Sequence, residues 1–347
     1  MITPMLAPVG NTPLVPCDRL AERLGLSRRI YAKLEQFNPG GSAKDRTARA
    51  MVEAAIADGR IDETTTPLLV ESSSGNLGIA LARQAHQRGW DFRCVVDPRA
   101  NAASLATMAR FGATIDMVNS PDAATGDWLT ARRARVQALL QEYPQAINLD
   151  QYSNQAAFTA HAEGTMAEIL NALDAPPEWL FVAVSTTGTL GGCQRKLREV
   201  GADTATMAVD AYGSILFEGP RATRVLPGFG AGVLPALAAH VHPTGVTRIG
   251  TKQAVIGAHA LTRVEGILPG ASGGAVIAAL AHAVATGVLS PSGKRPVVVV
   301  LHDSGAGYLD SIYDPGWLHR EVGITQDAIP QLVDALLAGD LGDYDRT

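Results

Sequence analysis

Short runs of β-branched and aliphatic residues alternate with longer amphipathic segments in the first half of this chain. The runs predict strands at Leu68–Val70, Phe92–Val96, Thr114–Val118 and Ala146–Leu149. The segments between them predict helices at Leu77–Gln87, Ser104–Phe111, Ala123–Glu142 and Ala157–Leu173. Strands that alternate with helices are typical of βαβ units with parallel strands.

The same alternation returns in the second half. It predicts strands at Leu180–Val184, Thr206–Val209 and Pro296–Leu301, and helices from the turn at 185–189 through Val200 and at Asp327–Ala338. The unbroken run Val297–Val300 is typical of a strand buried on both faces. Glycine and proline are frequent in Leu216–Gly245, which predicts a long irregular segment.

A length of 347 residues suits two α/β domains, and no linker divides the chain cleanly. We therefore predict an α/β protein made of two interleaved three-layer αβα domains with mostly parallel sheets.

Charge and composition narrow the possible functions. The net charge is −5 and the basic residues are scattered, which argues against nucleic-acid binding. No window of about 18 residues is apolar enough to span a membrane, and Met1–Pro4 lacks the basic start of a secretion signal, so we expect a cytoplasmic protein. The three cysteines lie far apart and the eight histidines form no metal-binding pattern, so we expect neither a disulfide framework nor a metal.

Three glycine-containing turns, Glu71–Gly78, Ser185–Thr189 and Pro269–Gly274, each precede a predicted helix. The first N–H groups of a helix lack partners and attract anions. The hydroxyl and amide groups of the first turn suit a carboxylate, and the four hydroxyls of the second can surround a phosphate without a lysine. Neither turn matches a P-loop or a dinucleotide fingerprint. Taken singly, each also fits an ordinary capped helix start.

A fourth segment, Asn38–Arg46, places Lys44 after a Pro-Gly-Gly turn at the start of a helix predicted to run to Asp58. The positive end of the helix dipole favours the neutral amine, which is the form that reacts as a Schiff-base nucleophile. Taken alone, a solvated lysine after a turn is the simpler interpretation.

Together, one amine, one phosphate-binding turn and one carboxylate-binding turn describe a pyridoxal phosphate enzyme. A hydrolase with Ser272 as nucleophile is an alternative, because Gly270–Gly274 reads Gly-x-Ser-x-Gly. That alternative lacks an acid and a histidine that the sequence can place beside the serine.

Several motifs follow one another in the order seen in the cysteine synthase and cystathionine β-synthase family. They are Asn11–Leu14, Lys33–Glu35, Asn38–Arg46, Ser73–Gly78, Gln151–Gln155, Gly228–Gly232, Glu265–Leu268 and Gly270–Gly274. The chain resembles that family from about residue 8 to residue 313. The resemblance implies a fold type II pyridoxal phosphate enzyme, similar to tryptophan synthase β, that acts on small amino acids as a homodimer. It also implies a large cofactor-binding domain, 1–45 plus 151–347, and a small mobile substrate-binding domain, 46–150.

The resemblance also implies roles for individual residues. Lys44 holds the cofactor covalently and later takes the α-proton as the catalytic base, Asn76 bonds the 3′-oxygen of the ring, and Ser272 faces the ring nitrogen. The cofactor's phosphate is bound by Ser185, Thr186, Thr187, Gly188 and Thr189. The substrate is bound by Ser73, Ser74, Gly75, Asn76, Gln151, Tyr152 and Ser185.

Several positions depart from ordinary cysteine synthases. Ser73 and Leu77 replace threonines, Ser185 and Thr187 replace glycines, Tyr152 replaces phenylalanine, and Ala306-Gly307 replaces a Glu-Arg pair. This combination resembles the branch that joins O-phospho-L-serine to L-glutamate. Its product, N-(1-amino-1-carboxyl-2-ethyl)-glutamate, is the precursor of 2,3-diaminopropionate in siderophore and antibiotic biosynthesis. The extra hydroxyls suit a phosphate leaving group and an amine nucleophile.

Arg132 and Arg133, on the helix after Trp128, are candidates for binding an anionic substrate, although a solvated arginine face is the simpler interpretation of either. Two alternatives to the glutamate-dependent reaction stay open. One is cysteine or cystathionine synthesis with a thiol nucleophile, and the other is a pseudoenzyme that keeps the fold without turnover.

Overall fold

The computed structural model describes residues 8–340, within which the chain forms two compact units. Unit 1 comprises residues 8–10 and 38–160, and unit 2 comprises residues 11–37 and 161–340. The predicted division at 45/46 and 150/151 stays a prediction, because packing units do not report which part of a chain moves. Residues 1–7 and 341–347 of the predicted large domain, including Met1–Pro4, lie outside the described residues.

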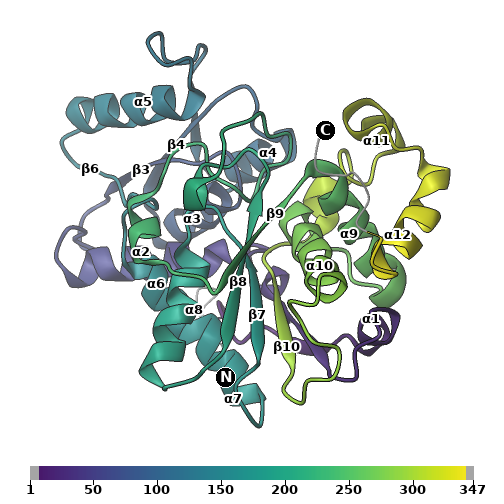
Figure 1. The fold of residues 1–347 in the computed structure, drawn as a ribbon. Coiled ribbons are helices and arrows are strands. Elements are labelled where there is room, and N and C mark those ends of the chain that lie inside the picture. Colours follow the sequence, from purple (N-terminus) through teal and green to yellow (C-terminus); the bar gives the residue numbers. More distant parts are fainter. Residues whose placement is uncertain (1–7, 341–347) are drawn as a thin grey trace. The chain divides into compact units, whose positions relative to one another are not determined.

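Unit 1 is built on a four-stranded parallel sheet in the order β5-β4-β3-β6 (Figure 1). Its strands are β3 (Leu68–Ser72), β4 (Asp91–Val96), β5 (Thr114–Met117) and β6 (Ala146–Ile147). Its helices are α2 (Lys44–Ala57), α3 (Asn76–Arg88), α4 (Ala102–Arg110), α5 (Trp128–Glu142) and α6 (Ala156–Ala160). Because side chains alternate along a strand, each face of the sheet carries its own apolar layer.

The two faces of this sheet are covered by different helices. Leu69, Phe92 and Cys94 pack with side chains of α2, α3 and α4. Leu68, Val70 and Val95 point to the other face, where Val136 and Leu139 of α5 cover them. Unit 1 is therefore a three-layer αβα arrangement.

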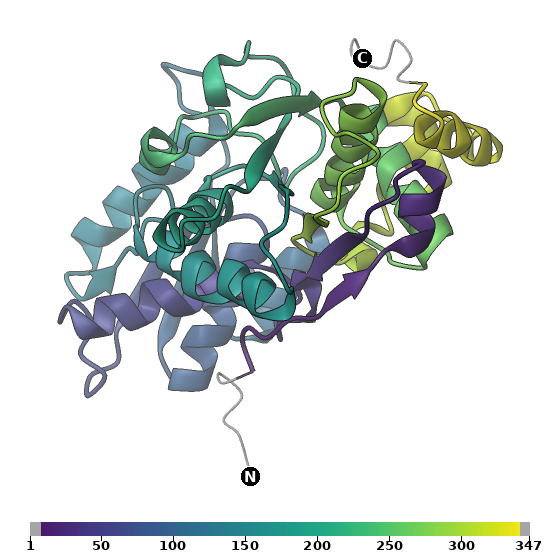
Figure 2. The ribbon, with the colours of Figure 1, turned by 60° about the horizontal axis from the view of Figure 1, so that its bottom comes forward.

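Unit 2 is built on a six-stranded sheet in the order β1-β2-β10-β7-β8-β9, in which only the β1–β2 pair is antiparallel. Its strands are β1 (Leu14–Pro16), β2 (Ile30–Leu34), β7 (Trp179–Ala183), β8 (Ala205–Ala211), β9 (Gly245–Ile249) and β10 (Val297–Leu301). Figure 2 shows β1 and β2, in purple, running side by side. The central strand β10 is fully buried, as its run of valines predicts.

Helices also cover both faces of this second sheet. They are α1 (Asp18–Arg23), α7 (Ala167–Ala172), α8 (Gly188–Glu199), α9 (Thr251–Glu265), α10 (Ala271–Ala285), α11 (Pro315–Val322) and α12 (Ile329–Leu337). One apolar core joins α1, α9, α10 and α12 to alternate residues of the strands, while α8 packs against β7 and β8 (Figure 1). The predicted α/β class with mostly parallel sheets is confirmed.

Several predicted boundaries were wrong. The helix expected over 123–142 begins only at Trp128, because Asp127 caps it by accepting from the Thr130 N–H and residues 122–126 form a turn. The helix expected over 157–173 is interrupted by a π-helical turn, His161–Met166. The helix predicted to follow the turn Pro269–Gly274 already begins at Ala271, so Ser272 lies in its first turn.

No helix within residues 8–340 is long and apolar enough to cross a membrane.

Candidate active site

The predicted carboxylate turn of unit 1 connects the end of β3 to the N-terminus of α3. Ser74, Gly75 and Asn76 are partly exposed there, whereas Ser73 is buried. The Ser73 hydroxyl accepts a hydrogen bond from the Gly78 N–H at 3.0 Å, which fixes the turn to the first turn of α3. A Cβ at Gly78 would lie 2.9 Å from the Ser73 carbonyl oxygen, so this close approach requires glycine. The turn thus presents the free N–H groups of a helix start beside side-chain donors.

Residues 148–152, which follow β6, form hydrogen bonds with the end of β3, where this turn begins. Asn148 donates to the Val70 carbonyl at 2.8 Å, and Gln151 donates to the Ser72 carbonyl at 3.3 Å. Asp150 adopts a left-handed conformation, with φ of 48°, and accepts from the Tyr152 N–H at 3.2 Å. The structure therefore brings Gln151 to the base of the turn, where the sequence predicts that it binds substrate.

Lys44 is the first residue of α2 and is half-buried. Its backbone N–H donates to the Ser42 hydroxyl at 3.2 Å. The neighbouring Asp45 side chain is buried, accepts from the Gly40 N–H at 2.9 Å and lies 3.4 Å from Arg83. The predicted start of the helix at Lys44 is confirmed, and the Pro-Gly-Gly turn is held on the helix by Asp45.

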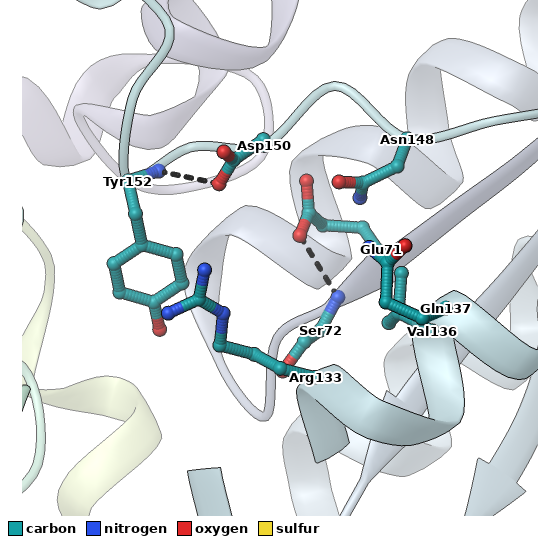
Figure 3. A pocket seen from close by; sticks show the side chains of 8 residues that line it. All are labelled: Glu71, Ser72, Arg133, Val136, Gln137, Asn148, Asp150 and Tyr152. Carbon is teal, nitrogen blue, oxygen red and sulfur yellow. Dashed lines mark hydrogen bonds between the residues drawn. The ribbon is translucent and has the colours of Figure 1, made fainter. Parts of the chain in front are cut away.

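Tyr152 lines a cavity of about 50 Å³ in unit 1 and points toward Arg133 (Figure 3). The Arg133 guanidinium carbon lies 5.9 Å from the centre of the Tyr152 ring, a cation–π arrangement. Arg133 is exposed, whereas Arg132 is buried with its Nε 3.3 Å from Asp97 Oδ2. Burial raises the pKa of Tyr152, and the two arginines only partly offset this, so its hydroxyl stays protonated at neutral pH.

Glu71 and Asp150 face the same cavity, with Glu71 at its centre in Figure 3. Glu71 is 3% exposed, and its Oε1 accepts from the Ser72 N–H at 2.9 Å. Burial raises the pKa of Glu71 to about 7, and the nearby charge of Asp150 adds to the shift. The sequence predicts Glu71 only as the first residue of the turn Glu71–Gly78, because a glutamate at the end of an apolar run gives no sign of its burial.

The predicted phosphate turn lies in unit 2, between β7 and α8. Thr187 has a left-handed φ of 65°, and its buried Oγ1 has no hydrogen-bond partner among the described residues. The Ser185 hydroxyl donates to the Gly230 carbonyl at 3.1 Å. An unpaired hydroxyl at the N-terminus of a 12-residue helix fits a bound phosphate, which accepts hydrogen bonds and favours the positive end of the dipole.

A chain of buried hydrogen bonds leads away from this turn within unit 2. His161 Nε2 lies 3.3 Å from Thr189 Oγ1, and His161 Nδ1 lies 2.9 Å from Thr165 Oγ1. Glu35 Oε1 then accepts from Thr165 and from Thr12, at 3.3 Å and 3.1 Å. The sequence predicts no functional role for His161, because its partners Thr165 and Thr189 are brought to it only by the fold.

Ser272 is 2% exposed and occupies the second position of α10. The bend before the helix is tight, because a Cβ at Gly270 would lie 2.1 Å from Asp303 Oδ1. The Tyr308 hydroxyl donates to Asp303 Oδ2 at 2.9 Å, which holds that carboxylate in place.

The predicted site residues are thus shared between the units. Unit 1 carries Lys44, the carboxylate turn, Gln151, Tyr152 and Arg132, while unit 2 carries Ser185–Thr189 and Ser272. No group of three or more potential metal ligands among His, Cys, Asp and Glu occurs within residues 8–340.

Comparison with known proteins agrees with this description. A family model described as "Pyridoxal-phosphate dependent enzyme" matches residues 5–303, and the chain belongs to that family. The predicted cofactor, pyridoxal phosphate, and the predicted enzyme class, a pyridoxal phosphate-dependent transferase, are therefore confirmed.

Solved structures place the fold among relatives of cysteine synthase. Cysteine synthase from Entamoeba histolytica is 27% identical with a TM-score of 0.83, and the match covers 97% of this chain and 96% of that one. An O-acetylserine dependent cystathionine β-synthase from Helicobacter pylori is 26% identical with a TM-score of 0.80, over 90% and 99% of the two chains. An O-ureido-L-serine synthase is 25% identical with a TM-score of 0.78, over 95% and 99%. The predicted fold type II architecture is confirmed.

Proposed function

We propose that this enzyme performs a β-replacement that joins O-phospho-L-serine to L-glutamate. The carbon–oxygen bond to phosphate breaks and a bond forms between the serine Cβ and the glutamate nitrogen, giving N-(1-amino-1-carboxyl-2-ethyl)-glutamate. Bound pyridoxal phosphate supplies the electron sink that makes the α-proton acidic and lets the leaving group depart.

This proposal assigns roles to residues of each unit. Lys44 would hold the cofactor, accept the α-proton and return it after the new bond has formed, and Asn76 would bond the ring oxygen. The turn Ser73–Asn76 and Gln151 would bind the carboxylate of the first substrate. Ser272 would face the ring nitrogen, and the phosphate turn of α8 would hold the cofactor's phosphate through its N–H groups and the unpaired Thr187 hydroxyl.

The preference for glutamate rests on one observation, the pairing of Tyr152 with positive charge on α5. Arg133 lies over the Tyr152 ring, and both Arg132 and Arg133 are close enough to lower the pKa of the phenol against the effect of burial. Glutamate carries two carboxylates, and a protonated phenol beside the exposed Arg133 guanidinium favours such an anion. A sulfide nucleophile has no carboxylate and gains nothing from this arrangement.

Ser185 supports the same reaction from unit 2. Its hydroxyl donates to the Gly230 carbonyl, so a glycine at this position would release the loop that contains Gly230.

The test is the rate of phosphate release from O-phospho-L-serine with glutamate, compared with sulfide, by the purified holoenzyme. We expect glutamate to accelerate release more than sulfide does. Arg133→Gln should raise the KM for glutamate about tenfold, which corresponds to about 1.4 kcal/mol, with little change in the first half-reaction. Arg110→Gln, at the end of α4, is the control. Equal rates with glutamate and sulfide would overturn the proposal.

Synthesis of cysteine or cystathionine with a thiol nucleophile is the second candidate, favoured by the names of two structural relatives. It predicts fast product formation from O-acetylserine and sulfide or homocysteine, and no effect of Ser185→Gly beyond cofactor binding. The glutamate reaction predicts that Ser185→Gly weakens glutamate use more than cofactor binding.

A further inference from the structure

Glu71 lies near the end of β3, two residues before Ser73, where the carboxylate-binding part of the turn (Ser73–Asn76) begins. Consecutive Cα atoms are about 3.8 Å apart, so the Cα atoms of Glu71 and Ser73 are within about 8 Å of each other. Glu71 Oε1 accepts from the Ser72 N–H, while its Oε2 is buried without a hydrogen-bond partner among the described residues. The side chain therefore reaches one backbone group of the turn, and the Asn148 amide and the Gln151 N–H lie close enough to lower the pKa of its carboxyl group only partly against the effect of burial.

Side chains of β4, of α5 and of the segment after β6 surround Glu71. The titratable and charged neighbours are Cys94 on β4, Arg132 and Arg133 on α5, and Asp150 and Tyr152 after β6. Cys94 lies opposite Glu71 in the sheet register, and burial raises the pKa of its thiol to about 12, so it stays neutral.

The two arginines do not compensate Glu71 in this structure. Arg132 is paired with Asp97, and Arg133 lies over Tyr152. No ion pair to Glu71 occurs within 4.0 Å among residues 8–340, and its acidic neighbour Asp150 opposes a second negative charge. An ionised Glu71 therefore has hydrogen-bond donors but no cationic partner, and a carboxylate bound on the turn next to it adds a further like charge across a poorly screened interior.

We infer that Glu71 is a positioning residue that takes up a proton when an anionic ligand binds the carboxylate turn. In the neutral state Glu71 still accepts from the Ser72 N–H through Oε1 and places its proton on Oε2, toward the cavity. This inference rests on the proposed function in one respect, namely that Ser73–Asn76 and Gln151 bind a carboxylate.

The direction of the pH dependence follows from the raised pKa of Glu71, about 7 in the free protein. Above that pH, ligand binding must also bring in a proton, so affinity falls up to about tenfold per pH unit. Below it the carboxyl group is already neutral and affinity is constant. Affinity for a carboxylate should therefore rise as the pH falls from 8 to 6 and then level off.

The probe is propionate, which has a carboxylate but no amino group and so cannot exchange with Lys44 on the cofactor. Its dissociation constant is measured on the holoenzyme from the change in cofactor absorbance between pH 6 and pH 8. The wild type should bind about tenfold more tightly at pH 6 than at pH 8. Glu71→Gln should remove this dependence and bind more tightly than the wild type at pH 8, which mere structural damage would not produce.

Two further variants make the test specific. Glu53→Gln, at an exposed position of α2, should keep the wild-type pH profile. Asp150→Asn removes the neighbouring charge, so the midpoint should move to lower pH; this variant serves if Glu71→Gln does not fold. The inference is overturned if Glu71→Gln keeps the pH dependence, or if the wild type shows none.

The outcomes also separate this inference from the proposed reaction. Propionate binding with the expected pH dependence, in an enzyme that does not use glutamate, would reject the proposed reaction and keep the role of Glu71. Glutamate-dependent turnover without any propionate binding would reject the carboxylate turn, and the role of Glu71 with it.

Discussion

His161 and Thr189 are joined by a buried hydrogen bond, with the imidazole Nε2 3.3 Å from the threonine hydroxyl oxygen. The other ring nitrogen lies 2.9 Å from Thr165 Oγ1, so the imidazole is held on both sides. It therefore fixes a hydroxyl of the turn that we assign to the cofactor's phosphate.

His161→Leu should weaken cofactor binding. The change removes both hydrogen bonds and leaves the Thr165 and Thr189 hydroxyls buried without that partner. This loss costs about 1–3 kcal/mol. We expect the dissociation constant for pyridoxal phosphate, measured by absorbance titration of the apoenzyme, to rise at least tenfold. His319→Gln, an exposed site on α11, is the control. An unchanged constant would show that His161 does not support the phosphate turn.

Lys44→Ala should abolish both the covalent attachment of the cofactor and turnover, because no other amine takes its place at the start of α2. Covalent attachment is checked by borohydride reduction followed by mass spectrometry, and turnover by phosphate release. Lys294→Ala, an exposed lysine of unit 2, should behave as the wild type. Full activity in Lys44→Ala would reject the assignment of the catalytic lysine.

Ser272→Asp should shift the absorbance spectrum of the bound cofactor and slow elimination. The helix dipole stabilises a carboxylate in the first turn of α10, and an ionised carboxylate opposite the ring nitrogen would keep that nitrogen protonated. Ser290→Asp, at an exposed position, is the matched control. An unaltered spectrum would mean that Ser272 does not face the ring.

Asp210→Asn should stabilise the protein at pH 8 and have little effect near pH 4. Asp210 is fully buried, its Oδ1 accepts from the Ala211 N–H, and its Oδ2 has no partner among the described residues. Burial raises its pKa from the ordinary 3.8 to about 6, so between those values the folded state binds more protons than the unfolded state.

The sign follows from linkage. Stability falls as the pH rises from about 4 to about 6 and then stays level, with a total effect of about 3 kcal/mol. Urea unfolding at pH 8 and pH 4 measures the difference, with Asp203→Asn, an exposed ion-paired site, as the control. A destabilised Asp210→Asn at pH 8 would contradict this account.

Much of the fold was predictable because parallel strands that are buried on both faces have continuous apolar sequences. β10 and β3 were found in this way. β2 was not, because Lys33 interrupts its apolar pattern. The Lys33 ammonium is buried only because it donates to Glu168 Oε2 at 2.6 Å and to the Thr12 carbonyl at 2.7 Å, contacts between residues far apart in the sequence.

Other errors have different physical causes. β9, Gly245–Ile249, is mostly half-buried at the sheet edge, so it lacks the apolar run of an interior strand. The π-helical turn His161–Met166 follows a normal helical pattern in sequence. One hydrogen-bond partner of His161, Thr189, lies on α8, far away in the sequence.

The candidate site was predictable where the functional groups of one site lie close together in the sequence. The turns before α3 and α8 place hydroxyls next to glycine at a helix start, which a sequence shows directly. Arg132 and Arg133 illustrate the limit, because adjacent residues on a helix differ by about 100° in direction. Only the packing of α5 shows that Arg132 meets Asp97 and that Arg133 meets Tyr152.

The position of β10 has a consequence for how the chain is made. This strand pairs with β2 on one side and β7 on the other, yet it spans residues 297–301 while β2 spans residues 30–34. At roughly 5–20 residues per second, a ribosome releases β10 on the order of tens of seconds after β2. Until β10 is made, β2 lacks a neighbour on one side, as does β7 once it has been made, and their unpaired edges are open to association with other nascent chains. We expect unit 2 to depend on chaperones until synthesis is nearly complete, whereas the sheet of unit 1 is finished by residue 147.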